Sequence, residues 1–227
     1  MEVMANSVDI HDTSLPKTEN ILQEKATEIN ISLQIKRNCL LALNNISKIT
    51  DNLYLSGAMS LSPSVLEALD IRYVINVAPE LPDTPLPSNV IKYTRIPVYD
   101  NLSSNLLEYF ESCADAIHEE ASNNRNVLVH CVAGVSRSAS ICIAYVMKYN
   151  KFNLLQAYNY VKERRPIVRP NCSFINQLIS FENTLYSSNS ISLVFNDHLK
   201  MMIPDIYAKD YKSHHDIRKE RNSSVKG

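Results

Sequence analysis

The 227-residue chain lacks the features that would place it in a membrane-spanning, secreted or nucleic-acid-binding class. No run approaches the roughly 18 apolar residues that a membrane-spanning helix needs. Residues 1–12 include acidic side chains and no continuous apolar stretch, so we expect no secretory signal. The formal net charge is −1, which gives no support for binding nucleic acid or a membrane surface.

Cysteine is also sparse and irregularly spaced. The five cysteines are Cys39, Cys113, Cys131, Cys142 and Cys172, and no two of them form a CxxC pair. This pattern is typical of reduced thiols inside the cell and argues against a disulfide framework or a zinc site. We therefore expect no metal and no other cofactor, and a location in the cytoplasm or also in the nucleus.

The length permits one domain of ordinary size with a tail at each end. Residues 1–44 are polar and rich in asparagine, and we expect an extension that is flexible or loosely docked. Regular patterning begins after this extension and predicts a folded domain over 45–187. Residues 188–227 form a C-terminal tail, which we expect to pack on the domain to about residue 207 and to be flexible beyond it.

Within 45–187, short β-rich runs alternate with amphipathic helical segments. The β-rich runs cover 52–55, 73–77, 90–98 and 127–129. Helical segments follow Ser62, cover 105–120 and 138–149, and follow the capping residues Asn153 and Asn171. This alternation predicts an α/β fold with a mostly parallel central sheet flanked by helices on both faces. In such folds the active site lies at the carboxyl ends of the strands.

The most informative segment is HCVAGVSRS, residues 130–138, which follows the apolar triplet 127–129. The strand brings Cys131 to the edge of the sheet, and a turn centred on Gly134 can direct successive backbone N–H groups into an anion-binding nest. The residues of this predicted loop are Val132, Ala133, Gly134, Val135, Ser136 and Arg137. The next helix adds the positive end of its dipole, and Arg137 offers a planar fork for two phosphate oxygens.

A cysteine at this position suits nucleophilic attack on a phosphate ester if it is a thiolate. A helix N-terminus and a nearby cation both favour the thiolate form of a cysteine. We expect His130 to brace the loop by hydrogen bonds, and Ser138 either to cap the helix or to stabilise the departing sulfur. The alternative, in which Cys131 is a small core residue, does not account for the assembled pattern of strand, glycine, arginine and helix.

The run HCVAGVSRSAS resembles the signature of the dual-specificity protein phosphatases, a branch of the cysteine-based tyrosine phosphatases with the pattern His-Cys-five residues-Arg-Ser/Thr. The likeness extends from about residue 46 to residue 207. It includes NLYL at 52–55, YVINV at 73–77, IPVYD at 96–100, RRP at 164–166 and RPN at 169–171. The segment PDIY at 204–207 is similar to a small atypical subgroup of this family. The resemblance implies that 45–187 is the catalytic domain.

This resemblance also implies the roles of the site residues. Asp100 matches the position of the family's general acid, whereas the residues alone leave a solvated turn aspartate as the alternative. In the implied reaction, Cys131 attacks phosphorus while Arg137 and the loop amides hold the oxygens and Asp100 protonates the leaving group. Water activated by the Asp100 carboxylate then cleaves the cysteinyl phosphate. The family's shallow pocket accepts phosphotyrosine and phosphoserine or phosphothreonine.

The loop contains no lysine, which favours phosphorylated proteins over inositol lipids as substrates. Arg164, Arg165 and Arg169 are expected either to contact a second phosphate or acidic flank of a substrate, or to form a solvated helix end. In the extension, Lys36-Arg37 followed by 41–43 has the order of short peptides that dock on MAP kinases. A short helix that packs on the domain is the alternative for that segment.

Two rival functions remain open at this point. The first is a phosphoprotein-binding scaffold that keeps the pocket without turnover, although such proteins usually lose the cysteine, the arginine or the acid, and this chain has all three. The second is a phosphatase for a non-protein ester such as an RNA 5′ end, glycogen or a lipid. The sequence does not determine the oligomeric state.

Overall fold

The computed structural model describes residues 45–211. The predictions for residues 1–44, including the docking peptide at Lys36-Arg37, lie outside the described residues. The same holds for the predicted flexibility of the tail beyond residue 211. These predictions therefore stay predictions.

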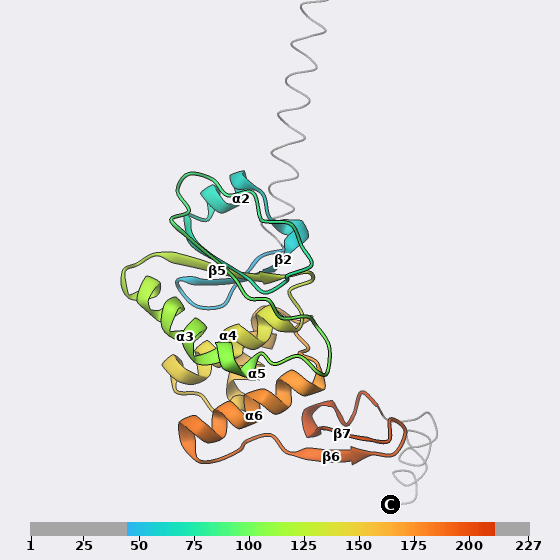
Figure 1. The fold of residues 1–227 in the computed structure, drawn as a ribbon. Coiled ribbons are helices and arrows are strands. Elements are labelled where there is room, and N and C mark those ends of the chain that lie inside the picture. Colours follow the sequence, from blue (N-terminus) through green and yellow to red (C-terminus); the bar gives the residue numbers. More distant parts are fainter. Residues whose placement is uncertain (1–44, 212–227) are drawn as a thin grey trace, which may run out of the picture. The chain divides into compact units, whose positions relative to one another are not determined.

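A five-stranded sheet forms the centre of the domain (Figure 1). Its strands are β1 (Ser47–Lys48), β2 (Leu53–Gly57), β3 (Ile71–Asn76), β4 (Lys92–Arg95) and β5 (Asn126–Cys131). The strand order is β1-β2-β5-β3-β4, and only the β1–β2 pair is antiparallel. The prediction of a mostly parallel sheet is confirmed.

Helices cover both faces of this sheet, as predicted (Figure 1). One face is covered by α3 (Leu107–Ser122), α4 (Arg137–Asn150), α5 (Leu154–Arg164) and α6 (Cys172–Tyr186). The other face is covered by the short helix α2 (Pro63–Ala68), which contacts β3. Helices α3 and α4 contact the strands, whereas α5 packs on α4 and α6. Within the described residues, none of these helices has the length and apolar character to cross a membrane.

The helix starts follow the capping signals of the sequence. The side chains of Ser62, Asn153 and Asn171 each accept a hydrogen bond from a first-turn N–H, and Asn153 forms a complete capping box with Gln156. Helix α3 begins two residues later than predicted, because the side chain of Gln177 from α6 accepts hydrogen bonds from the N–H groups of Leu106 and Leu107. The side chain of Asn105 also accepts from the N–H of Leu107, so a local and a distant contact together stabilise this helix start.

Strand β5 shows why the central run is apolar throughout. Side chains alternate between the two faces of a strand. Val127 and Val129 lie in the large core between the sheet and α3–α6, whereas Leu128 lies in the small core under α2. Both faces of the strand are buried at residues 127–129, so all three of these positions are apolar. Cys131, the last residue of the strand, reaches the edge of the large core.

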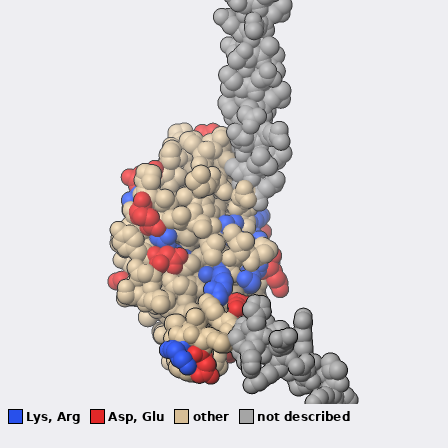
Figure 2. Space-filling view, turned by 90° about the vertical axis from the view of Figure 1, so that its right-hand side faces the viewer, with Lys and Arg blue, Asp and Glu red and all other residues tan. Residues whose placement is uncertain are grey.

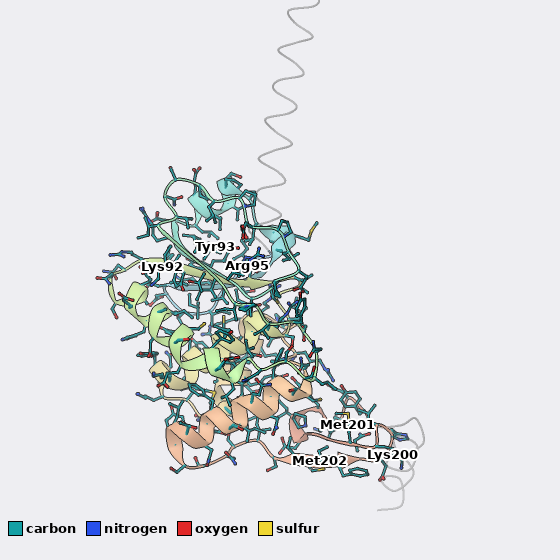
Figure 3. All side chains as sticks on the ribbon, viewed as in Figure 1. Lys92, Tyr93, Arg95, Lys200, Met201 and Met202 are labelled. Atoms are coloured by element: carbon teal, nitrogen blue, oxygen red, sulfur yellow. The ribbon has the colours of Figure 1, made fainter. Side chains whose placement is uncertain are left out.

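The segment after α6 forms an antiparallel hairpin that the sequence patterns do not reveal. Strands β6 (Leu193–Asn196) and β7 (Met201–Pro204) pair with each other, and a single turn of 3-10 helix, η2 (Asp205–Tyr207), follows. Figure 3 shows Lys200, Met201 and Met202 at the turn end of this hairpin. The buried Tyr207 anchors the segment to the domain, where its hydroxyl donates to the carbonyl of Pro170 at 2.9 Å.

Candidate active site

The motif that contains Cys131 forms a loop at the carboxyl edge of the sheet. Strand β5 ends at Cys131 and helix α4 begins at Arg137, so residues 131–137 connect a central strand to a helix N-terminus. We call this segment the Cys131 loop. Gly57, the last residue of β2, pairs with Cys131 across the sheet, so β2 ends directly beside the loop.

The carbonyl groups of the Cys131 loop are bound from outside the loop. Those of residues 132 and 135 accept hydrogen bonds from the N–H groups of Ala58 and Arg169, at 3.0 and 2.9 Å. Those of residues 133 and 134 accept from Nη2 and Nε of Arg165, at 3.1 and 2.7 Å. In a trans peptide the N–H points away from the C=O. The N–H groups of residues 133–136 therefore face the interior of the loop, which is the arrangement of an anion-binding nest.

Two of the chain's three glycines make this loop possible. Gly134 has a φ of +67°, and a Cβ added there would lie 2.4 Å from the backbone carbon of Ser56. A Cβ at Gly57 would lie 2.9 Å from the backbone of Ala133 and of Val132. The sequence patterns identify Gly134 but miss Gly57. The available signal is the scarcity of glycine, since one of only three glycines follows the β-rich run 52–55 after a single residue.

The sulfur of Cys131 is almost fully buried, with a relative exposure of 2% for the residue, and accepts two hydrogen bonds. Gly134 N–H donates to Sγ at 3.3 Å, and the Ser138 hydroxyl donates at 3.1 Å. Donors aimed at a sulfur favour its negatively charged form. Of the two roles expected for Ser138, the structure shows contact with the sulfur. Helix α4 has no side-chain cap, and its N-cap residue is Ser136.

The other described cysteines differ from Cys131 in their surroundings. Burial raises the pKa of Cys113 to about 11 and also raises the pKa values of Cys142 and Cys172. These three side chains are therefore neutral thiols at physiological pH. Within residues 45–211, no group of three His, Cys, Asp or Glu side chains is placed to hold a metal ion.

Arg137 lies at the start of α4 with its guanidinium buried. Nη1 and Nη2 bind the two carboxylate oxygens of Glu80 at 2.9 and 2.7 Å, and Nη1 also donates to the carbonyl of Val98. Burial by itself would lower the pKa of Arg137, but the hydrogen bond to Glu80 and the charges of Cys131, Glu80 and Asp100 outweigh it and raise the pKa. The buried Nε has no hydrogen-bond partner among the described residues. Its N–H is therefore available to an oxyanion.

Glu80 is a site residue that the sequence patterns miss. The hydrogen bond from Arg137 lowers the pKa of its carboxyl group, so Glu80 is ionised at neutral pH. Arg95 on β4, labelled in Figure 3, donates to the carbonyls of Pro79 and Leu81 at 3.4 and 2.8 Å and so anchors the residues on both sides of Glu80. No local pattern could have paired Glu80 with an arginine 57 positions away.

Asp100 lies at the mouth of the loop. Its Oδ1 accepts hydrogen bonds from Ser136 Oγ at 2.9 Å and from Asn171 Nδ2 at 2.8 Å. Its Oδ2 lies 3.8 Å from Nε of Arg137 and makes no hydrogen bond to the described residues. With a side chain 35% exposed, Asp100 is accessible to a substrate. The structure thus brings Asp100 to the other predicted residues and adds Asn171, which the sequence predicts only as a helix cap.

His130 lies under the loop, in the interior. Its Nε2 is 3.1 Å from Thr84 Oγ1, and its Nδ1 is 3.4 Å from the carbonyl oxygen of Cys131. Burial lowers the pKa of His130 to about 4. A neutral, hydrogen-bonded imidazole fits the expected bracing role and not that of a proton carrier at physiological pH.

The three arginines of the 164–169 segment have different positions. Arg164 stacks on Tyr160 with its guanidinium carbon 3.5 Å from the ring centre. Arg169 lies against the ring of Tyr207 and forms an ion pair with Asp210 at 3.4 Å. Arg165 is 7% exposed and binds backbone carbonyls of the Cys131 loop. Both expectations for Arg165, a substrate contact and a solvated helix end, are therefore wrong, because its guanidinium is buried behind the loop and donates to backbone carbonyls.

Charged side chains on the face shown in Figure 2 lie in small groups of both signs on a mostly uncharged surface. The described part of this face presents no broad patch of one sign.

Comparisons with known proteins agree with this geometry. The family model described as "Dual specificity phosphatase, catalytic domain" matches residues 53–184. Mouse dual specificity protein phosphatase 14 is 40% identical over 169 residues, which is 74% of this chain and 83% of the relative. Human dual specificity protein phosphatase 18 is 40% identical over 172 residues, 75% of this chain and 89% of the relative.

A solved structure also resembles the domain. It is the crystal structure of a mouse putative dual specificity phosphatase complexed with zinc tungstate. The two chains have a TM-score of 0.58 and 29% sequence identity, and the match covers 63% of this chain and 89% of the other.

Proposed function

This chain belongs to the dual-specificity phosphatase family and is a protein phosphatase, and we propose that Cys131 is its nucleophile, Asp100 its general acid and Arg137 its phosphate-binding cation. The observation that supports these roles best is the Cys131 loop. Its sulfur accepts two hydrogen bonds, and its carbonyls at 132–135 are all bound from outside. The interior is thus left to N–H donors, which stabilise the negative charge of a phosphoryl group.

In the first step the Cys131 thiolate attacks phosphorus in line and forms the S–P bond, while the bond from phosphorus to the ester oxygen breaks. Asp100 gives its proton to that oxygen. Because Ser136 and Asn171 both donate to Oδ1, the proton has to be on Oδ2, the oxygen nearest Arg137. Arg137 Nε and the inward N–H groups hold the other phosphoryl oxygens.

In the second step a water molecule attacks the phosphorus of the cysteinyl phosphate. The Asp100 carboxylate accepts a proton from this water, the S–P bond breaks, and inorganic phosphate forms. The sulfur leaves as a thiolate. Ser138 Oγ and Gly134 N–H are already placed to stabilise that negative charge, at 3.1 and 3.3 Å from Sγ.

Phosphorylated proteins are the substrates of this enzyme class, and we propose MAP kinases among them. This finer proposal is supported by the basic-then-aliphatic segment at Lys36-Arg37 and 41–43. We also propose a location in the cytoplasm, with the nucleus as a second location, which is supported by the irregular cysteine spacing and by the free thiols of the four described cysteines.

Hydrolysis of an aryl phosphate and of phosphotyrosine and phosphothreonine peptides by the purified chain tests the assigned roles. We expect Cys131→Ser to abolish turnover while tungstate still binds. Loss of general acid catalysis in Asp100→Asn is expected to lower kcat by about 10²–10⁴-fold for a phenyl leaving group. The loss should be much smaller for an activated nitrophenyl ester, because a good leaving group needs no proton.

The same assay separates the rival functions. A wild-type rate no higher than that of Cys131→Ser would favour a non-catalytic phosphoprotein-binding scaffold. Turnover of phosphoinositides, phosphorylated glycogen or RNA 5′ ends that exceeds turnover of phosphopeptides would favour a non-protein ester as the substrate.

A further inference from the structure

Arg165 is a buried cation with only neutral hydrogen-bond partners. Its Nε and Nη2 donate to the carbonyls of Gly134 and Ala133, and its Nη1 donates to the carbonyl of Asn45 at 2.9 Å and lies 3.4 Å from Ser47 Oγ. Within residues 45–211 it forms no ion pair with a carboxylate. A buried charge of this kind is costly unless an anion lies nearby.

The candidate for that anion is Cys131. Burial lowers the pKa of Arg165, and the negative charge of Cys131 acts in the opposite direction and favours the charged guanidinium. Such an interaction is mutual, so the Arg165 cation also favours the Cys131 thiolate. The positive charge of Arg165 would also stabilise a phosphoryl group bound in the loop.

A single peptide group connects Arg165 to the sulfur. The carbonyl of Ala133 and the N–H of Gly134 belong to the same peptide and point in opposite directions. Arg165 Nη2 binds the carbonyl end at 3.1 Å, and the N–H end donates to Cys131 Sγ at 3.3 Å. Hydrogen bonds in such a chain polarise one another, so a cation at one end strengthens the donor at the other.

We propose that Arg165 is a positioning residue for this phosphatase, which acts from behind the Cys131 loop to hold its N–H groups inward and to favour the Cys131 thiolate through the peptide between Ala133 and Gly134. The inference rests on the proposed function of Cys131. It adds a second cation, behind the loop, to Arg137, which the proposed mechanism places against the phosphoryl oxygens.

The other charged or titratable groups around the sulfur do not supply this effect. Arg137 acts from α4 and is shared with Glu80 and Asp100. His130 is neutral because burial lowers its pKa to about 4, and Cys142 on α4 is a thiol because burial raises its pKa. Arg165 is therefore the one cation near the sulfur that has no carboxylate partner among the described residues.

Alkylation of Cys131 by iodoacetamide, measured against pH, tests the proposal. The variants are Arg165→Met, Arg165→Gln and Arg165→Lys, with Arg164→Met as the matched control, since Arg164 is the neighbouring arginine and stacks on Tyr160 outside the loop. Cys131→Ser gives the background from the other cysteines. Unfolding in urea shows which variants are folded.

We expect the midpoint of the alkylation profile to rise by about one pH unit or more in Arg165→Met and Arg165→Gln, the shift typical of losing a nearby opposite charge. We expect kcat/KM for an aryl phosphate to fall by about tenfold or more in the same variants, since a misplaced loop also weakens transition-state binding. Arg165→Lys keeps the charge but not the fork, so its midpoint should return toward wild type while kcat/KM stays low. Arg164→Met should match wild type in both measurements, because an aryl phosphate has no second phosphate or acidic flank that Arg164 could contact.

The glutamine variant keeps hydrogen-bonding capacity and decides the outcome if the methionine variant does not fold. A folded Arg165→Gln protein with the wild-type midpoint would overturn the proposal, even if its kcat/KM were reduced, because a purely structural role would then suffice. Failure of the proposed function is recognised separately, by a Cys131→Ser protein as active as wild type.

Discussion

The substitution Gly57→Ala tests how much the close packing between strand β2 and the Cys131 loop contributes to catalysis. Gly57 has φ −89° and ψ 160°, an extended conformation that alanine adopts without strain. The only change is one methyl group. Its carbon would lie 2.9 Å from the backbone carbon of Ala133 and from the carbonyl oxygen of Val132. Both are backbone atoms of the loop and cannot turn aside as a flexible side chain would.

The size of the effect follows from these distances. Ordinary van der Waals contact begins near 3.4 Å, so the loop or the strand has to move by about 0.5 Å. The hydrogen bonds from Ala58 and Arg165 to the loop carbonyls resist such a movement. Overpacking of this kind typically costs about 1–3 kcal/mol of stability. A misplacement of 1 Å can cost about 10²-fold in rate, so we expect kcat/KM to fall by about tenfold.

The measurement is kcat/KM for an aryl phosphate together with the free energy of unfolding in urea. Ser56→Ala is the control, because Ser56 precedes Gly57 and its buried hydroxyl has no hydrogen-bond partner among the described residues. Its removal should leave kcat/KM unchanged and stability equal or slightly higher. If folded Gly57→Ala kept the wild-type kcat/KM, the close approach of β2 would not be what shapes the loop.

Three further predictions concern other residues. Ser138→Ala removes one donor to the departing sulfur, so phosphoenzyme should accumulate in rapid-quench experiments, and steady-state hydrolysis without such accumulation would contradict this role. Burial lowers the pKa of His130 to about 4, below its unfolded value of about 6.5. The unfolded state then binds more protons between these values, so the folded protein loses up to about 3 kcal/mol as the pH falls from 6.5 to 4. Urea titrations at several pH values should show a smaller loss of unfolding free energy for His130→Gln than for wild type. The same dependence of the unfolding free energy on pH in both proteins would exclude this contribution of His130. Deletion of residues 1–44 should reduce turnover of a phosphorylated MAP kinase but not of an aryl phosphate, and equal effects on both substrates, or none, would exclude docking.

The sequence determined those parts of the protein that depend on short-range physics. The alternation of apolar runs and helical segments predicts the α/β sheet, because side-chain periodicity is a local property of strands and helices. The caps at Ser62, Asn153 and Asn171 fix helix starts because each cap satisfies an N–H within three residues. The Cys131 loop could also be predicted, since its nucleophile, glycine and arginine lie within seven residues.

The role of Asp100 could be predicted from the sequence only in part. Its place after an extended run is compatible with an ordinary turn aspartate, and only the resemblance to the family pointed to an acid. The tertiary structure brings its Oδ2 to 3.8 Å from Arg137 and engages its Oδ1 with Ser136 and Asn171. The orientation of this carboxyl group depends on residues up to 71 positions away, which no local pattern contains.

Only the tertiary structure decided which groups surround the loop. Glu80 pairs with Arg137 because the loop after β3 crosses the carboxyl edge of the sheet, and Gly57 meets Ala133 because β2 is hydrogen-bonded to β5 in a register that ends at Cys131. The sequence predicts Arg165 in a substrate contact or at a solvated helix end, yet the turn after α5 places it behind the loop, where it donates to the loop carbonyls. Sheet register and helix packing set these contacts. They depend on how whole elements bury their apolar faces against one another, and periodicity within a single element does not specify that arrangement.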